Sequence, residues 1–314
     1  MIDKVVEQLS ILRQKCKDGR VSVLVGSGFS KNVSNIFPSW YELLNDMTAD
    51  LYDEEIDASY LRYLSIHPMV KMDREVFARQ EIPRVIARKG PLKVVSEFIA
   101  RSGFRETIEN YIEERIPYID KENNEFRFVG KNHDKSEAIN PDSLAAHSRL
   151  LNSRWQRVYT TNYDRLLEFV SDSEGKGYQS VTNAGKLAVY SNKEYIIKLH
   201  GDLQHPFEPR SFCFDSNPHQ QYVISEEDYK NYPQEHEAFT QLMRISLLQG
   251  VFCLIGFSGE DPNFLNWIEW VRDVIVREAS NTSDKDEKEK DYKIYLIDIS
   301  SDLPALGMSF PEKS

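Results

Sequence analysis

The chain has 314 residues, of which 40% are hydrophobic, and its 50 acidic and 39 basic residues give a formal net charge of −11. This length and hydrophobic content suffice for one large or two modest domains with a sizeable core. The acidic balance gives no footprint for a phosphate backbone, so we expect no direct binding to nucleic acid. No apolar run approaches the roughly 18 to 20 residues that span a bilayer, and charges interrupt the N-terminal apolar stretches, so we expect a cytoplasmic protein without a membrane partner.

The cysteines and histidines indicate no metal site. Cys16, Cys213 and Cys253 cannot all pair with one another, and none stands in a C-x-x-C motif. Neither a disulfide framework nor a zinc ribbon is therefore expected. The histidines show no metal-ligand spacing, and we predict no metal.

Five short, nearly continuous apolar runs have the pattern of parallel strands that are buried on both faces. They cover residues 21–26, 157–161, 195–200, 251–257 and 293–299. Helical patterns separate most of them. Strands that alternate with helices predict an α/β fold with a Rossmann-like, doubly wound parallel sheet.

Between residues 39 and 140 a helical insertion interrupts this alternation. Its first helix begins after Ser39, a predicted N-cap, and a later helix begins at Pro91, where a first turn tolerates proline. We expect the insertion to close over one end of the sheet. Its last part, residues 121–140, is rich in charge and predicts a mobile loop.

Small residues directly follow the first predicted strand. The stretch "VLVGSGFS" places Gly26, Ser27, Gly28 and Ser30 where a glycine-rich turn lets backbone N–H groups approach a ligand phosphate. The full dinucleotide fingerprint requires a further glycine at position 31, which is lysine here. A turn that merely ends the strand explains this motif equally well.

Polar residues follow the next predicted strands. Thr161, Asn162 and Asp164 come just past a carboxyl end, the edge at which open α/β sheets bind ligands. Asn162 or Asp164 would also serve as a helix cap, and both interpretations can hold together. The stretch "KLHGD" places His200 at the same edge.

The last two predicted strands continue this pattern. In "IGFSGEDPNF" Gly256 and Ser258 are placed to line a ligand, while Asp261 and Pro262 form a predicted N-cap and N1 pair. The fifth strand ends in Asp298. Five strands therefore end in small or polar residues at the edge where a nucleotide would lie. The five strand ends together indicate a nucleotide site more specifically than any one of them does.

These motifs resemble the Sir2 (sirtuin) family, and more particularly its bacterial Sir2-like branch found in antiphage defence. The chain contains "VGSGFS", "TTNYD", "KLHGD" and "IGFSGEDPNF", in the order of the sirtuin motifs G-A-G-x-S, T-Q-N-x-D, H-G and G-x-S. The resemblance runs from residue 21 to residue 299, and the 39–140 insertion carries little of it. It implies a Sir2-like NAD-binding domain over residues 1–314, with NAD as substrate.

The resemblance also implies a role for each matching residue. Residues 26–30 would embrace the pyrophosphate, with Thr161 beside them in the cofactor site. Asn162 would position the attacking oxygen at the nicotinamide ribose, Asp164 would bond the nicotinamide carboxamide, and His200 would act as general base.

The adenosine half of NAD would meet the last two strands. By resemblance, Ser258 would contact the adenosine, and Asp298 would approach the adenine or its ribose. A carboxylate at the ribose would favour NAD over NADP, because it repels a 2′-phosphate.

The departures from the sirtuin pattern bear on the reaction. Sirtuin deacylases form one wall of the acyl-lysine groove with a four-cysteine zinc ribbon, which three scattered cysteines cannot build. Thr161 stands where sirtuins have glutamine, and Ser27 stands where they have alanine. We therefore expect water as the acceptor, so that NAD is hydrolysed to ADP-ribose and nicotinamide by a regulated NAD-depleting effector in antiphage defence.

Two alternatives stay open at this point. One is a noncatalytic sensor of NAD or of an ADP-ribose derivative, and the other is an NAD-dependent protein deacylase or ADP-ribosyl transferase. The resemblance also implies a homo-oligomer, with a regulatory NTPase or sensor as a further partner that restrains a toxic activity.

Overall fold

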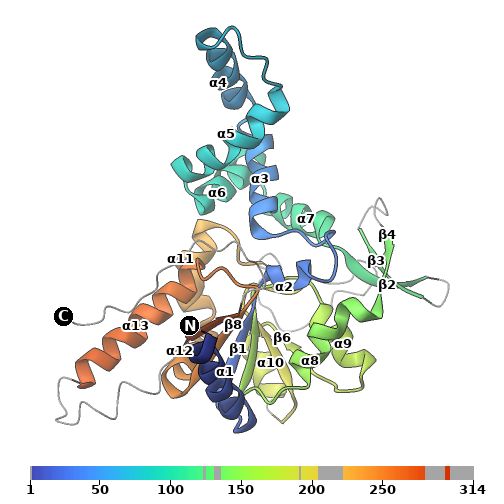
Figure 1. The fold of residues 1–314 in the computed structure, drawn as a ribbon, viewed down its shortest axis with the longest axis vertical. Coiled ribbons are helices and arrows are strands. Elements are labelled where there is room, and N and C mark those ends of the chain that lie inside the picture. Colours follow the sequence, from blue (N-terminus) through green and yellow to red (C-terminus); the bar gives the residue numbers. More distant parts are fainter. Residues whose placement is uncertain are drawn as a thin grey trace.

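A parallel sheet of six strands lies at the centre of the computed structural model, which describes residues 2–122, 125–130, 136–190, 192–203, 222–279 and 294–297 (Figure 1). The strands stand in the order β6-β7-β5-β1-β8-β9, and each pairs with its neighbours in parallel. Their bounds are Val21–Val25 (β1), Arg157–Thr160 (β5), Gln179–Val181 (β6), Tyr195–Lys198 (β7), Val251–Ile255 (β8) and Ile294–Ile297 (β9).

The five strands predicted from apolar runs are confirmed. The prediction missed β6, because this short edge strand contains the polar residues Gln179 and Ser180. From β1 the chain runs to β5 on one side and later returns to β8 on the other. The order therefore reverses at β1, and such a switch point opens a ligand crevice outside the carboxyl ends of the strands.

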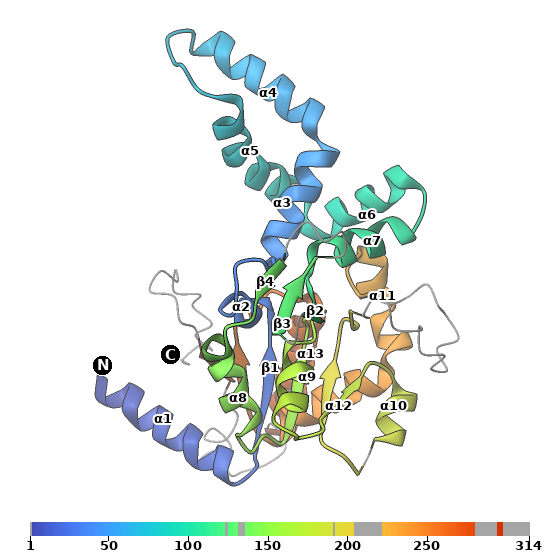
Figure 2. The same cartoon turned by 90° about the vertical axis from the view of Figure 1, so that its right-hand side faces the viewer.

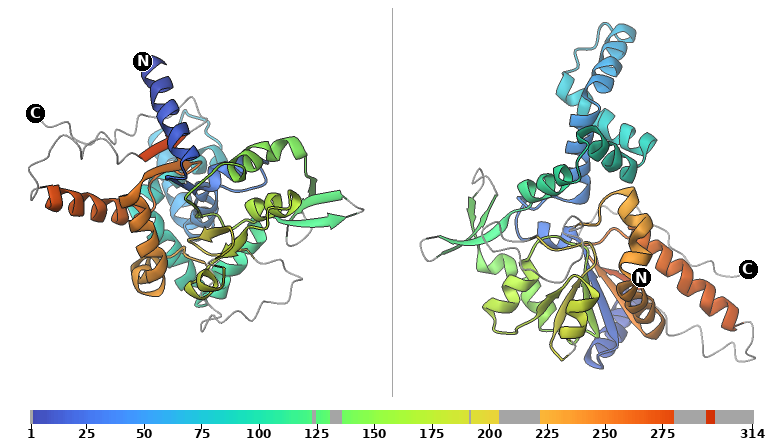
Figure 3. Two further views of the ribbon diagram at one scale, coloured as in Figure 1. Left: turned by 90° about the horizontal axis from the view of Figure 1, so that it is seen from below. Right: turned by 180° about the vertical axis from the view of Figure 1, so that it is seen from behind.

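Helices cover both faces of the sheet, so the doubly wound α/β fold is confirmed. Val21, Val23 and Val25 of β1 pack with apolar residues of α1, α8 and α9, whereas Leu24 packs with those of α11, α12 and α13. Figure 3 shows these two groups of helices on opposite sides of the sheet. The bounds are Ile2–Lys17 (α1), Ala145–Leu151 (α8), Leu166–Ser173 (α9), Ala184–Val189 (α10), Glu226–Glu235 (α11), Glu237–Gln249 (α12) and Pro262–Ala279 (α13). None of the helices in the described ranges is long and apolar enough to cross a membrane.

The segment between β1 and β5 begins with a short helix and then rises above the sheet as five further helices, two of which, α4 and α5, project from the body as an arm (Figure 2). Ser39 caps α3 as predicted: its side chain accepts from the Glu42 N–H, and the Glu42 carboxylate accepts from the Ser39 N–H. Pro91 is the first residue of α6, also as predicted. The bounds are Ser27–Lys31 (α2), Trp40–Leu51 (α3), Asp53–Ile66 (α4), Arg74–Lys89 (α5), Pro91–Ser102 (α6) and Glu106–Arg115 (α7).

The prediction of a loop over residues 121–140 was wrong for the described part of that segment. An antiparallel sheet is formed there by Tyr118–Glu122 (β2), Glu125–Val129 (β3) and Ser136–Ala138 (β4), and the 3₁₀ helix Pro141–Leu144 follows. Two phenylalanines explain the strand, because Phe126 contacts the Phe169 ring and Phe128 contacts the Phe37 ring, both with centroids 5.0 Å apart. Frequent charges masked this alternation of apolar residues.

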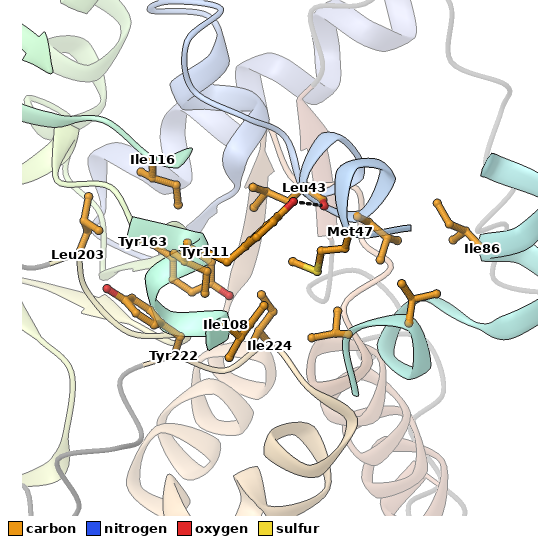
Figure 4. Packing of buried hydrophobic residues seen from close by; sticks show 14 of the residues in the cluster. Leu43, Met47, Ile86, Ile108, Tyr111, Ile116, Tyr163, Leu203, Tyr222 and Ile224 are labelled. Carbon is orange, nitrogen blue, oxygen red and sulfur yellow. Dashed lines mark hydrogen bonds between the residues drawn. The ribbon is translucent and has the colours of Figure 1, made fainter. Parts of the chain in front are cut away.

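One buried cluster fastens the inserted helices to the carboxyl edge of the sheet (Figure 4). Leu43 and Met47 of α3 and residues of α7 meet Tyr163 and Tyr222, which come from the loops after β5 and before α11. The Tyr163 and Tyr222 rings meet edge to face with centroids 5.1 Å apart, and the Tyr111 hydroxyl donates to the Leu43 carbonyl at 3.0 Å. This packing holds the helices over the strand ends.

We expect His147 to make the fold sensitive to acid. Its side chain is buried against the Phe29 ring, and burial lowers its pKa from 6.5 to about 3. Below pH 6.5 this histidine takes up a proton in the unfolded chain but not in the folded chain. The free energy of unfolding therefore falls by roughly 1.4 kcal/mol for each pH unit, until about pH 3. Urea unfolding of His147→Leu between pH 7 and pH 4 should show a flatter decline than the wild type.

The matched control is His67→Leu, because His67 is exposed on the arm. It should retain the wild-type decline. Equal declines in the His147 variant and the wild type would contradict this account of His147.

Candidate active site

A cavity of about 850 Å³ opens at the carboxyl ends of β1, β5, β7 and β8, and the inserted helices cover it. Nine of the predicted site residues line it: Ser27, Gly28, Ser30, Thr161, Asn162, Asp164, His200, Gly256 and Ser258. Gly26 lies behind the lining, and its carbonyl accepts from Asn162. Asp298 lies outside the described residues. The topology thus brings together side chains that are distant in the sequence.

Two glycine turns pack backbone against backbone at the switch point. A Cβ atom on Gly26 would lie 2.5 Å from the Gly256 carbonyl oxygen, and one on Gly256 would lie 2.3 Å from the Phe29 nitrogen. Gly256 also has a φ of +60°, which side chains rarely adopt. Only glycine fits at this contact between the ends of β1 and β8.

The backbone donors of the first turn are largely used inside the protein. The Gly26 and Gly28 N–H groups donate to the Ile255 and Gly256 carbonyls at 3.0 Å, and the Phe29 N–H donates to the Gly26 carbonyl. The first two donors hold the ends of β1 and β8 together, and the third closes the first turn on itself, so these three N–H groups do not face a ligand. The turn therefore shapes the cavity floor, which agrees with the structural interpretation of its glycines.

Asn162 is the most constrained polar residue in the cavity. It is buried, and its Nδ2 donates to the Gly26 carbonyl at 3.1 Å and to Ser30 Oγ at 2.9 Å. A carbonyl oxygen can only accept a hydrogen bond, so the atom of the Asn162 side chain that lies beside the Gly26 carbonyl must be the amide nitrogen. Asn162 Oδ1 has no protein partner, and a buried acceptor in that state is available to a ligand or a water.

Asp164 completes a chain of hydrogen bonds from Asn162. Ser30 Oγ accepts from Asn162 and donates to Asp164 Oδ2 at 2.7 Å, while Asp164 Oδ1 accepts from the Leu166 N–H at 3.1 Å. Burial raises the pKa of Asp164, and the charge of Lys198 together with these hydrogen bonds opposes that rise. Asp164 thus also binds the first backbone N–H of α9, whose N-cap residue is Arg165.

His200, which follows β7, is buried beside a carboxylate from the segment after β8. Its Nε2 lies 3.2 Å from Asp261 Oδ2, which also accepts from the Tyr229 hydroxyl at 2.9 Å. Burial would raise the pKa of Asp261, but His200, the Phe264 N–H and the Tyr229 hydroxyl outweigh it, so this pKa lies below its usual value. Asp261 is therefore an anion beside the imidazole, at an ion-pair distance from Nε2 without the geometry of a hydrogen bond.

Sequence reasoning missed the site roles of Asp261 and Tyr229. Asp261 was predicted only as an N-cap, which is confirmed, because its Oδ1 accepts from the Phe264 N–H at 2.9 Å and α13 begins at Pro262. Its second oxygen faces His200. The "EDP" motif beside a strand end was the available signal, whereas Tyr229 lies within α11 and gave none.

Residues of the inserted helices cover the cavity. Trp40 and Tyr41, from the start of α3, line it, and the Tyr41 hydroxyl donates to Glu260 in the turn after β8. This bond ties the cover to the sheet. Among the residues that the structure describes, no group of three or more His, Cys, Asp or Glu side chains is placed to hold a metal ion.

A parallel α/β sheet with a cavity at its switch point defines the class of Rossmann-like α/β folds. Within that class, residues 156–294 match the family model of the SIR2-like domain. The similarity to the Sir2 family that the motifs indicate is thus confirmed for this part of the chain.

Similar proteins come from bacteria. Defense-associated sirtuin 2 of Bacillus subtilis is 24% identical over 274 residues, which is 87% of this chain and 21% of that protein. NAD(+) hydrolase ThsA of Bacillus cereus is 29% identical over 122 residues (38% and 23%), and the ThsA of Acinetobacter baumannii is 31% identical over 113 residues (33% and 20%). The chain spans about a fifth of the length of these curated relatives.

We expect alanine at position 256 to disrupt the cavity floor, because its Cβ would meet the backbone of Gly28 and Phe29. The added clash should cost several kcal/mol more than the backbone strain alone, which is about 1 to 2 kcal/mol for a left-handed residue. Chemical denaturation of Gly256→Ala measures this loss.

Gly259→Ala is the matched control, because Gly259 also has a positive φ, of +79°, but nothing lies within 4 Å of an added Cβ. In Gly259→Ala the free energy of unfolding should fall only by the amount of the backbone strain. Similar stability of the two variants would show that the two turns do not need their close contact.

Proposed function

We propose that this protein hydrolyses NAD to ADP-ribose and nicotinamide in the cavity at the strand ends. One observation carries the proposal: the unpartnered Asn162 Oδ1 and the buried His200–Asp261 pair line the same cavity. The names of the ThsA relatives support NAD as the substrate.

The reaction breaks the bond between the ribose C1′ and nicotinamide, and the bond's electron pair leaves with the nicotinamide nitrogen. Positive charge then builds on the sugar, so the enzyme must hold the leaving group and aim an oxygen nucleophile at C1′. Asn162 Oδ1 would accept a hydrogen bond from a ribose hydroxyl or from the attacking water. Asp164 lies one hydrogen-bonded link further, beside Ser30, where it would bind the nicotinamide carboxamide.

His200 would take the proton that the attacking water loses. A positioned base of this kind contributes roughly 10² to 10⁴ in rate. The Asp261 carboxylate, 3.2 Å from Nε2, would stabilise the imidazolium that forms. The proton later passes to solvent, so water supplies the hydroxyl group of ADP-ribose and the other atoms of both products come from NAD.

The cover over the cavity supports water as the acceptor. Trp40 and Tyr41 line the cavity, and the Tyr41–Glu260 hydrogen bond joins this cover to the turn after β8, which would limit the space for an acceptor peptide. Ser27, Thr161, Gly256 and Ser258 would contact the rest of the dinucleotide, with Ser258 at the exposed rim.

The relatives' names also support a wider setting for this reaction. Because one similar protein is a defence-associated sirtuin, we propose that NAD is depleted as part of antiphage defence. Such an activity needs restraint, and we propose assembly into a homo-oligomer, or control by a regulatory NTPase or sensor partner, in the cytoplasm. The supporting argument is the toxicity of unrestrained NAD loss.

We expect Asn162→Ala and His200→Ala each to lower nicotinamide release from NAD by at least about 100-fold, because each removes a group aimed at the reacting atoms. The assay uses purified protein over a range of concentrations, without any peptide. Asn152→Ala and His67→Ala are matched controls, since neither residue lines the cavity, and they should retain wild-type rates.

The same experiment separates hydrolysis from its alternatives. A sensor would bind NAD without turnover, and a deacylase would release nicotinamide only when an acylated peptide is added. Full activity of the Asn162 and His200 variants would overturn the assignment of this site.

A further inference from the structure

A buried lysine lies directly behind the proposed catalytic loop, outside the cavity. Lys198 is the last residue of β7, and its side chain has no exposed surface. Its Nζ donates to the Tyr163 carbonyl at 3.2 Å and to the Asp164 carbonyl. One ammonium group therefore binds the backbone on the far side of the loop whose other side presents Asn162 to the cavity.

Two carboxylates share this ammonium. Lys198 Nζ lies 2.8 Å from Asp202 Oδ1 and 3.5 Å from Glu168 Oε1. Asp202 stands two residues after His200 and also accepts from the Ser180 hydroxyl, while Glu168 belongs to α9. The ammonium thus joins the turn that carries His200 to the loop that carries Asn162.

Lys198 stays charged in this setting. Burial would lower its pKa, but the carboxylates of Asp202, Glu168 and Asp164 outweigh burial and raise it above the usual value. Burying a cation that has four oxygen partners costs less free energy than burying an unpaired cation. Removing the ammonium would leave the charges of the neighbouring carboxylates without compensation.

The charge also bears on the direction of the hydrogen bonds in the site. Asp164 accepts with both oxygens, one from Ser30 and one from the Leu166 N–H, as an ionised carboxylate does, and the charge of Lys198 favours that form against burial, which raises the pKa of Asp164. Ser30 donates to Asp164 and so accepts from Asn162 Nδ2, which leaves Asn162 Oδ1 for the ligand. A protonated Asp164 would be able to donate to Ser30, and the Gly26 carbonyl would then be the one partner that requires Nδ2 as a donor.

We propose that Lys198 is a positioning residue of this site: its buried ammonium holds the 162–165 loop in place and so supports the position of Asn162 and of the Asp164 carboxyl group beside the cavity. This inference rests on the proposed function. The charged groups that act on Asp164 are Lys198 from β7 and Asp202 from the turn after it, while Glu168 of α9 interacts with Lys198, Asp202 and Arg165.

The test variant is Lys198→Met combined with Glu168→Gln, which removes one buried charge of each sign. Asp202 then keeps Ser180 and the nearby Arg165. We expect the kcat for nicotinamide release to fall about 10- to 100-fold at pH 7, as for a misplaced catalytic group. The acid limb of the kcat profile should also move to higher pH, because Asp164 loses the cation that favours its ionised form, while KM changes less than about threefold.

Lys176→Met is the matched control, because Lys176 is a partly buried lysine paired with Glu174 at 3.0 Å. It should keep the wild-type kcat and pH profile. A wild-type kcat and acid limb in the double variant, or loss of cooperative unfolding in circular dichroism, would overturn the positioning role and leave Lys198 as a purely structural residue.

Calorimetric titration of NAD separates this inference from the proposed function. If the wild type binds NAD without cleaving it, hydrolysis fails as a proposal, and the pH dependence of NAD binding then tests Lys198. The double variant should lose NAD affinity at a higher pH than the wild type. Coincident binding profiles would overturn the inference.

Discussion

The side-chain amide of Asn162 is the interaction on which the arrangement of the site depends. It bonds the Gly26 carbonyl and Ser30, and so connects the loop after β5 to the turn after β1. A buried amide that leaves a donor unpaired loses about 1 to 3 kcal/mol, so these two bonds strongly favour one rotamer and one flip state. The orientation of this amide, whose residue lines the cavity, is then fixed before any ligand arrives, and such preorganisation lowers the free-energy cost of binding and catalysis.

The surrounding charges support this single arrangement from behind. Lys198 neutralises a cluster of carboxylates beneath the loop, and His200 lies against Asp261 on the other side of the cavity. The chain thus buries anions near the strand ends but provides a cation or a hydrogen-bond donor for each of the site carboxylates Asp164, Asp202 and Asp261. The inserted helices complete the cavity, because a buried cluster with Tyr163 and Tyr222 holds them above it.

The sheet and much of the site could be predicted from the sequence, because buried parallel strands leave continuous apolar runs and their carboxyl ends collect at one edge. Asn162 and His200 lie at such ends, and the structure places both in one cavity. For Asp261 the sequence predicted only the helix cap. The same carboxylate also lies beside His200, and the sequence does not show which strand end comes to lie next to that histidine.

Other features depend on distant contacts. The β3 strand exists because Phe126 and Phe128 meet rings from α9 and from the segment after α2, and no local signal outweighed its charges. Lys198 ends a strand whose apolar pattern is unremarkable, and only the folded arrangement shows that its ammonium reaches two carbonyls of another loop. The glycines likewise suggested a phosphate turn, whereas their N–H groups bind the neighbouring turn.

The most direct test of the central claim is a crystal structure of the His200→Ala variant with NAD, in which slow turnover preserves the substrate. The account predicts the nicotinamide ribose in the cavity, with one of its hydroxyls or an ordered water within hydrogen-bond distance of Asn162 Oδ1 and the carboxamide at Asp164. NAD bound with its nicotinamide ribose away from Asn162, or bound outside this cavity, would contradict the account.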